Sequence, residues 1–380
     1  MRIGYDVRPF LKEETGVGVY FKNLLSSLSR IDHSNEYFLF SSSWKDRLPQ
    51  KKIPPFTRSK FQDFRFPVKA VNFFWSRLGW PRMDTFFRTS LDLTHSPTPL
   101  VTPTGGKKIV TVHDLFFMDF PGLTEKEAGK GFARGIESSL RKADGVIAVS
   151  KFTKNQLLEK FVVDDKKIRV IYHGTDPRFT ADLSPDTAQS YREKYSLPPS
   201  FLLFVGAIEP RKNLLNLVEA LKIVHETYEK IHLVLIGPPG QDFKRLEKRI
   251  KQNKFEPLIR VLGYLPEEEV RIFYRLASVF VFPSLSEGFG LPLLESMASG
   301  LPVVTSKNSA IPEVVNDAAL YVHPEHPEDI AEKIVLALKD EKLRSHLIER
   351  GKKRASRFDW KKAAEQTLDF YTEIMQRSQA

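Results

Sequence analysis

Two glutamates with seven residues between them, Glu287 and Glu295, enclose a glycine-rich segment and the expected start of a helix. The segment reads EGFGLPLLE, and its proline favours a first helical turn because the missing N–H would have no partner there. Unpaired N–H groups at a helix start can bind a phosphate. The two carboxylates can accept hydrogen bonds from a sugar at one end and a ribose at the other. The competing interpretation is an ordinary turn with solvated glutamates.

A second candidate segment is FVGAIEPRKN, in which Arg211 and Lys212 follow an apolar strand pattern. Open α/β sheets bind their ligands beyond the carboxyl ends of their strands. A guanidinium and an ammonium at that position can neutralise a diphosphate. The alternative is an exposed basic pair with no ligand. The sequence has no Asp-x-Asp pair and no plausible metal-ligand cluster, so we expect catalysis without a metal ion or other cofactor.

Two shorter motifs lie in the first half of the chain. Gly16, Val17 and Gly18 form a loop pattern after the first expected strand, and His113 stands at the end of a strand pattern in TVHDL. A polar side chain at a strand end can contact a ligand. The competing interpretation for His113 is a purely structural histidine.

The elements that must position these residues alternate between strand and helix patterns along the 380 residues. Such alternation predicts an α/β protein with two doubly wound parallel sheets. We expect a first domain at residues 1–175, a linker rich in Pro, Asp and Ser at 176–200, and a second domain at 201–359. The last residues, 360–380, read as an amphipathic helix that is free to pack back on the first domain.

Composition excludes several classes of protein. The absence of cysteine rules out disulfides, thiolate metal sites and cysteine nucleophiles, and it favours a reducing compartment. The longest apolar runs are far shorter than the roughly 20 residues that span a bilayer. Charges within MRIGYDVRPF argue against a signal peptide. We therefore expect a cytoplasmic protein, at most peripheral at the cytoplasmic face of a membrane.

The formal net charge of +11 arises in the first half of the chain. Residues 44–88 interleave lysine and arginine with tryptophan and phenylalanine, as in VKAVNFFWSRLGWPRMDTFFR. This mixture is typical of a segment that docks on an anionic membrane surface. The alternative is an aromatic core with a basic rim. Because no recognition motif accompanies the charge, we expect no nucleic-acid partner.

In their order and separations, these segments resemble the retaining glycosyltransferases of family 4, also called group 1. That family has the GT-B fold of two facing Rossmann-like domains with an interdomain cleft. The resemblance rests on SEGFGLPLLESMASGLPVV, VGAIEPRKN, TGVGVY and TVHDL. HSPTPL, GTD and SKNSAIPEVVNDAALYVHP resemble the mannosyltransferase B-like branch, which builds bacterial O-antigen and other polysaccharides. The chain departs from the family pattern at His173, where asparagine is usual, and at Val17, where a second glycine is usual.

The resemblance implies a role for each candidate residue. Arg211 and Lys212 would hold the donor diphosphate and stabilise its charge as it leaves, and Glu295 would hold the ribose. Glu287 would position the donor sugar, and His113 would lie beside it. The other implied donor-binding positions are Gly16, Val17, Gly18, Gly206, Gly263, Tyr264, Gly288, Phe289, Gly290 and Leu291.

The implied reaction moves a hexose, mannose from GDP-mannose before sugars from UDP donors, to a glycan or lipid-linked acceptor. The acceptor hydroxyl would attack the same face that the phosphate leaves, so the anomeric configuration would be retained. Other enzymes of the same architecture are the alternatives, namely a UDP-sugar transferase, a nucleotide-sugar epimerase or an α-glucan phosphorylase, although no cofactor lysine for the last is identifiable. A nucleotide-sugar sensor without catalysis is a further alternative.

Overall fold

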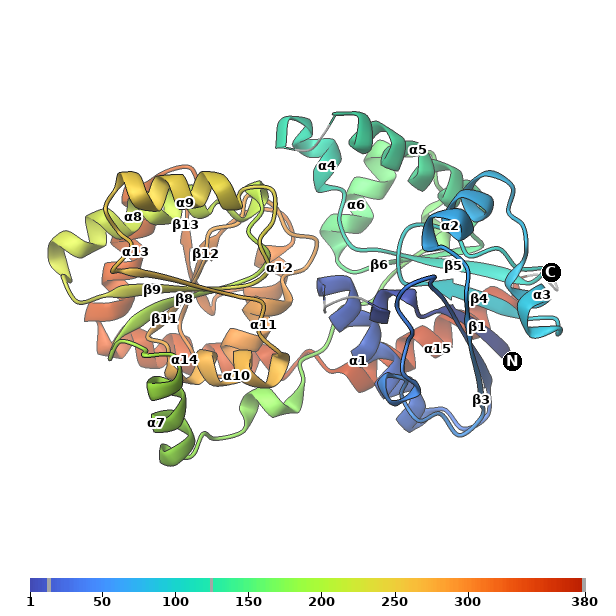
Figure 1. Cartoon of the computed structure of the whole chain (residues 1–380), viewed down its shortest axis with the longest axis horizontal. Helices are drawn as coiled ribbons and strands as arrows, with labels where there is room; N and C mark the ends of the chain where they lie inside the picture. The colour runs from blue at the N-terminus through green and yellow to red at the C-terminus, as the bar shows by residue number, and fades with distance from the viewer. Residues whose placement is uncertain (12–14, 124–125, 378–380) are drawn as a thin grey trace. The chain divides into compact units, whose positions relative to one another are not determined.

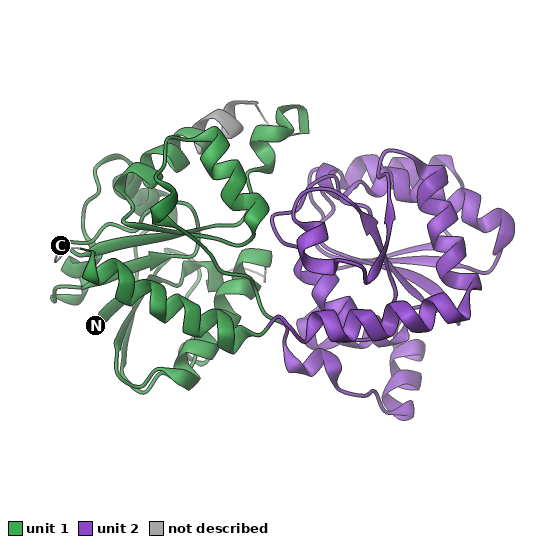
Figure 2. Ribbon diagram, turned by 180° about the vertical axis from the view of Figure 1, so that it is seen from behind, with its two compact units in different colours: residues 1–174, 359–380 green, residues 175–358 purple. Residues whose placement is uncertain are grey.

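The chain forms two compact units, each built on one parallel sheet (Figures 1 and 2). The computed structural model describes residues 1–11, 15–123 and 126–377. The first unit contains residues 1–174 and 359–380, and the second contains residues 175–358. No described helix has the length and apolar character needed to cross a membrane.

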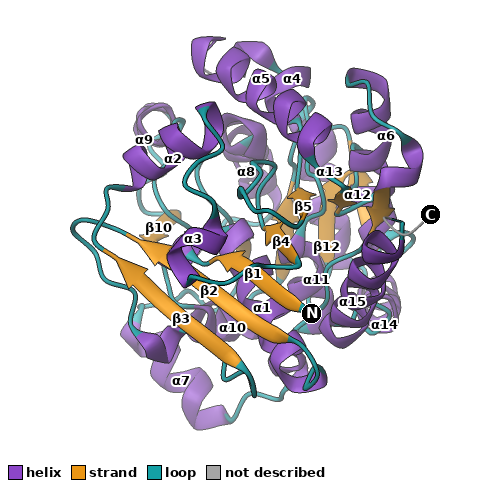
Figure 3. Cartoon of the chain, turned by 90° about the vertical axis from the view of Figure 1, so that its right-hand side faces the viewer, coloured by secondary structure: helices purple, strands orange, loops and turns teal. Residues whose placement is uncertain are grey.

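The first unit has a seven-stranded sheet with β1 near its centre. Its strands, from edge to edge, are β3 (Ser59–Phe64), β2 (Glu36–Ser42), β1 (Arg2–Asp6), β4 (Leu93–Ser96), β5 (Lys107–Val112), β6 (Gly145–Ala148) and β7 (Ile168–Val170). Figure 3 shows β3, β2 and β1 side by side. Residues 37–40 of β2 are fully buried because helices and loops cover both faces of the sheet.

The helices of the first unit include one from the end of the chain. They are α1 (Gly16–Ile31), α2 (Val68–Arg77), α3 (Met83–Phe87), α4 (Phe116–Asp119), α5 (Lys126–Lys142), α6 (Lys151–Lys160) and α15 (Trp360–Gln376). Helix α15 packs against α1 and against the start of β6. A Cβ atom at Gly145 would lie 2.9 Å from the Phe370 ring, so this contact requires glycine.

The second unit repeats the architecture with a six-stranded sheet. Its strands, in spatial order, are β10 (Ile259–Gly263), β9 (His232–Ile236), β8 (Phe201–Val205), β11 (Val279–Phe282), β12 (Val303–Ser306) and β13 (Ala319–Val322). Its helices are α7 (Pro185–Lys194), α8 (Leu214–Thr227), α9 (Phe243–Gln252), α10 (Glu267–Leu276), α11 (Leu291–Ala298), α12 (Ile311–Val315), α13 (Pro327–Lys339) and α14 (Glu341–Ala355). The neighbouring strands β8 and β11 are almost entirely buried.

The structure differs from the predicted linker at residues 176–200. These residues belong to the second unit and contain α7. Arg178 forms ion pairs with Asp176 at 2.6 Å and with Glu267 at 2.7 Å, and the Tyr195 ring lies 5.1 Å from that of Phe273. These contacts hold the segment against α10, although its sequence is rich in turn residues. The unit boundary therefore falls between residues 174 and 175, and the chain returns to the first unit at residue 359.

Candidate functional site

Arg211 and Lys212 meet Glu287 within the second unit. The basic pair follows β8 in a short 3-10 turn, and Glu287 follows β11, the neighbouring strand. Lys212 Nζ lies 2.6 Å from Glu287 Oε1, and Arg211 Nη1 lies 2.8 Å from Glu287 Oε2. The carboxyl ends of adjacent parallel strands thus bring two segments together that are 75 residues apart.

This cluster is buried rather than solvated. Lys212 is 5% exposed and Glu287 is 6% exposed, so the interpretation of an exposed basic pair is wrong for Lys212. Burial alone would raise the pKa of Glu287, but the charges of Arg211 and Lys212 outweigh it and lower that pKa. Burial, reinforced by the charge of Arg211, lowers the pKa of Lys212. Glu287 therefore faces two cations, and Arg211 forms a second ion pair with Glu209 at 3.0 Å.

The glycine-rich segment leads directly into α11. Gly290 caps the helix with φ 101°, a conformation that favours glycine, and a Cβ there would lie 2.8 Å from Leu293. The Glu287 N–H donates to Ser309 Oγ at 2.8 Å, which fixes the start of the segment. Phe289 is buried, and its ring centroid lies 5.8 Å from that of Phe358. Its side chain is therefore part of the core, and only its backbone is available to bind a ligand.

Glu295 has a different environment from Glu287. It lies in α11 and accepts a hydrogen bond from the Tyr274 hydroxyl at 2.9 Å. Burial raises the pKa of Glu295 to about 7, although the bond from Tyr274 opposes this shift. Of the implied donor-binding positions, Gly263 is the last residue of β10, with φ 70°, and Tyr264 follows it directly.

Sequence reasoning missed three partners in the second unit: Glu209, Tyr274 and Ser309. Glu209 stands within the quoted VGAIEPRKN segment, but its role depends on a turn that the pattern does not specify. Ser309 stands within the quoted SKNSAIPEVVNDAALYVHP segment, but nothing in that pattern marks it as a partner of Glu287. Tyr274 lies outside every quoted motif.

His113 and the first glycine motif belong to the first unit. His113 follows β5, and its Nε2 lies 2.9 Å from the Pro97 carbonyl oxygen, which requires the proton on Nε2. Burial lowers the pKa of His113, which favours the neutral ring. Gly16, Val17 and Gly18 form the first turn of α1 rather than a loop, with Thr15 Oγ1 accepting from the Gly18 N–H.

Tyr20 connects this helix start to His113. The two rings lie 4.8 Å apart, and the Tyr20 hydroxyl is 3.2 Å from Thr111 Oγ1. From Thr111 a buried network continues to His95 at 2.7 Å and from His95 to the Tyr371 hydroxyl at 2.5 Å. The last helix of the chain therefore helps to fix the residues around His113.

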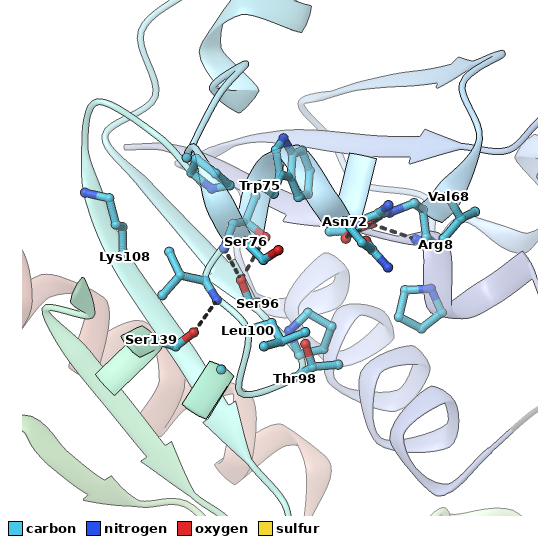
Figure 4. Close-up of a pocket in the computed structure, with 18 of the residues that line it drawn as sticks. Arg8, Val68, Asn72, Trp75, Ser76, Ser96, Thr98, Leu100, Lys108 and Ser139 are labelled. Carbon is cyan, nitrogen blue, oxygen red and sulfur yellow. Dashed lines mark hydrogen bonds and ion pairs between the residues drawn. The ribbon is translucent and has the colours of Figure 1, made fainter. Parts of the chain in front are cut away.

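The first unit also contains a pocket of about 760 Å³ (Figure 4). Its lining comes from the turn after β1, from α2, from the loop between β4 and β5, and from α5. Arg8, Trp75, Ser96 and Lys108 are among its polar and aromatic side chains. His113 is not among the residues that line it.

Two family models match the chain, and curated relatives match it over nearly its whole length. The model "Glycosyl transferases group 1" matches residues 188–354, and "Glycosyltransferase Family 4" matches residues 15–179. O-antigen chain mannosyltransferase B of Escherichia coli is 29% identical, over 98% of this chain and 99% of its own length. An uncharacterized glycosyltransferase of Methanocaldococcus jannaschii is 31% identical, over 94% of this chain and 95% of its own.

Solved structures of low sequence identity share the fold. Sucrose-phosphate synthase from Thermosynechococcus elongatus has a TM-score of 0.78 at 19% identity, with 99% of each chain covered. HepE from Anabaena, in complex with UDP and glucose, has a TM-score of 0.76 at 17% identity, with 98% of this chain and all of HepE covered.

Proposed function

Since the chain belongs to the group 1 and family 4 glycosyltransferases and has the GT-B fold of two Rossmann-like domains, we propose that it transfers a hexose from a nucleotide sugar to a glycan or lipid-linked acceptor. The observation that carries the proposal is the buried contact of Arg211 and Lys212 with Glu287, beside the glycine-capped start of α11. Two cations and a helix N-terminus form an environment suited to a diphosphate. The likeness to O-antigen chain mannosyltransferase B favours mannose, from GDP-mannose, and a role in cell-surface polysaccharide synthesis.

In the proposed reaction the bond between the anomeric carbon and the donor phosphate breaks, and its electron pair goes to the phosphate oxygen. Arg211 and Lys212 stabilise the charge that develops there. The acceptor hydroxyl attacks from the same face and passes its proton to the departing phosphate. Glu287 then orients the cations and the donor sugar, while Glu295 accepts from the ribose. No metal ion is part of this proposal.

The test is incubation of the full chain with GDP-mannose or UDP-sugars and a panel of glycan acceptors, followed by NMR of the product. We expect a product with the donor's anomeric configuration, formed equally well in excess EDTA. An inverted anomeric centre would overturn the retaining reaction, and loss of activity with EDTA would overturn metal independence. An isomerised nucleotide sugar in place of a glycoside would favour the epimerase alternative.

We expect donor binding to depend on pH through Glu295. The ionised carboxylate accepts hydrogen bonds from ribose hydroxyls more strongly than the protonated acid does, and the pKa of Glu295 is about 7. The KM for the donor should therefore fall several-fold between about pH 6 and pH 8. Steady-state kinetics across this range measure it, and Glu295→Gln should give a flat profile. A profile unchanged by Glu295→Gln would remove Glu295 from the donor site.

Stability should change with pH in the opposite direction. The pKa of Glu295 in the folded chain is raised above its usual 4.5, so folding disfavours the charged form. Its contribution to stability is complete below about pH 4.5 and is lost as the pH rises through about 7. Glu295→Gln should therefore gain stability relative to the native chain at pH 8 but not at pH 5.

We also propose that residues 44–88 dock on an anionic membrane. Some aromatic residues of this stretch belong to the core, and others are exposed and available to contact a membrane. Phe56, Trp75 and Phe87 are buried, whereas large exposed fractions remain on Trp44, Phe66, Phe73, Phe74 and Trp80. Exposed aromatic side chains among cations are suited to the boundary between lipid headgroups and acyl chains.

Flotation with phosphatidylglycerol vesicles tests the docking. The triple variant Trp44→Ser, Phe73→Ser, Phe74→Ser should bind at least about tenfold more weakly, because each loses an apolar side chain that enters the lipid. The control is Val162→Ser, which changes a fully exposed apolar residue outside this stretch. Equal flotation of the triple variant and the control would defeat the hypothesis.

A further inference from the structure

We infer that the pocket of the first unit binds an amphiphilic phosphate, with the phosphate against Arg8 and an alkyl chain along the apolar rim. We identify this amphiphilic phosphate as the acceptor of the transferred hexose, and that identification alone rests on the proposed function. It is carried by the pocket's charge, by the donors of Arg8 and by the exposed apolar side chains at its rim.

Arg8 is the buried cation of the pocket. Its side chain is 9% exposed, and it forms a bidentate pair with Asp6, with Nε to Oδ1 at 2.8 Å and Nη2 to Oδ2 at 2.6 Å. The guanidinium carbon lies 4.9 Å from the Trp75 ring centroid, which fixes its plane. The remaining nitrogen, Nη1, is buried and makes no hydrogen bond to any described residue. Arg8 therefore has an unused N–H hydrogen-bond donor that is held in place beside the pocket.

The rest of the lining is strongly basic. Arg77, Arg82, Lys108 and Lys142 also line the pocket, against Asp46 as the only acidic lining residue besides Asp6. None of these four cations forms an ion pair with a carboxylate in the described parts of the chain. A phosphate, which carries up to two negative charges and accepts several hydrogen bonds, complements this lining better than a neutral sugar does.

Apolar side chains lie at the same pocket. Val68, Leu78 and Leu100 line it, with 36%, 65% and 38% of their surfaces exposed. Figure 4 shows Val68 and Leu100 at the pocket together with Asn72 and Trp75 of α2. The same helix carries the exposed Phe73 and Phe74. An alkyl chain can therefore run from the pocket along α2, whereas a soluble sugar phosphate would leave these apolar surfaces uncovered.

The inference is tested by calorimetry with the full chain and no nucleotide sugar. The probes are decyl phosphate, decanol, inorganic phosphate and mannose 1-phosphate. Decyl phosphate should bind most tightly, and Arg8→Gln should weaken its binding about 10 to 100-fold because a charged hydrogen bond is lost. Since Arg8→Gln leaves Asp6 unpaired, the double variant Asp6→Asn, Arg8→Gln serves as a second test that removes both charges together.

A rim variant and a control complete the design. Arg77→Ser with Lys108→Ser should weaken binding several-fold and reduce its salt dependence. Lys51→Ser with Arg58→Ser changes exposed cations outside the lining and should bind as the native chain does. If decanol binds as tightly as decyl phosphate, the pocket does not recognise a phosphate. If mannose 1-phosphate binds as tightly as decyl phosphate, the pocket does not recognise an alkyl chain. Binding that survives the Arg8 variants would overturn the assignment to this pocket.

The two proposals can fail separately. If decyl phosphate binds through Arg8 but no glycoside is ever formed, the proposed function falls and the pocket stands. If the chain transfers a hexose but binds none of the probes, the proposed function stands and the pocket assignment falls.

Discussion

We expect Lys212→Ala to lower kcat about 100 to 1,000-fold with a much smaller change in the KM for the donor. Negative charge grows on the leaving diphosphate as the glycosidic bond breaks, so a buried ammonium stabilises the transition state more than the ground state. Lys212 is almost completely buried, and its charge is therefore little screened by water. Initial rates at saturating donor and acceptor measure the effect.

The matched control for this prediction is Lys222→Ala, which removes an exposed lysine of α8 in the same unit. It should retain normal kcat. Circular dichroism and thermal melting show whether Lys212→Ala remains folded, because the substitution leaves Glu287 with Arg211 as its cationic partner in the cluster. A folded Lys212→Ala protein with near-native kcat would refute the phosphate-binding role.

Glu287→Ala should produce the largest loss of stability. It removes the carboxylate that contacts both Arg211 and Lys212 and leaves two neighbouring cations, one of them deeply buried, without it. Breaking a buried ion pair from one side typically costs about 3 to 5 kcal/mol. For a unit of this size that corresponds to a fall in Tm of roughly 6 to 20 °C.

The same variant distinguishes a cluster that binds a diphosphate from an ion pair that is purely structural. GDP should raise the Tm of Glu287→Ala more than that of the native chain, because the diphosphate replaces the missing negative charge. The control Glu268→Ala changes an exposed glutamate of the same unit and should show neither effect. A GDP-induced shift no larger in Glu287→Ala than in the native chain would argue against a diphosphate at this cluster.

The sequence predicts the central part of the second unit's sheet well. FLLFV and VFVF are apolar on both faces, and such runs form buried parallel strands. Because these two strands are neighbours, the residues that follow them must meet, and that is how Arg211, Lys212 and Glu287 come together. The general position of the second-unit cluster therefore follows from residue pattern and topology.

The edge strands of the sheets and the individual side-chain contacts are not predictable in this way. Strand β3 reads SKFQDF and is largely exposed, so it lacks the apolar run that marks an interior strand. Residues 176–200 have the composition of a linker, yet tertiary contacts of Arg178 and Tyr195 hold them in the second unit. The partner of Glu295, Tyr274, lies in α10, and only the packing of α10 against α11 brings the two together.

The return of α15 to the first unit dictates an order of events during synthesis. Tyr371 contacts Tyr5 of the first strand, and Phe370 and Ile374 fill the space above Gly145. The whole second unit is synthesised before these side chains exist. At a typical elongation rate the incomplete first sheet waits on the order of 10 to 40 s for its last helix. Chains that end before residue 360 should therefore expose the apolar surface of β6 and α1 to chaperones, because the helix that covers it is missing.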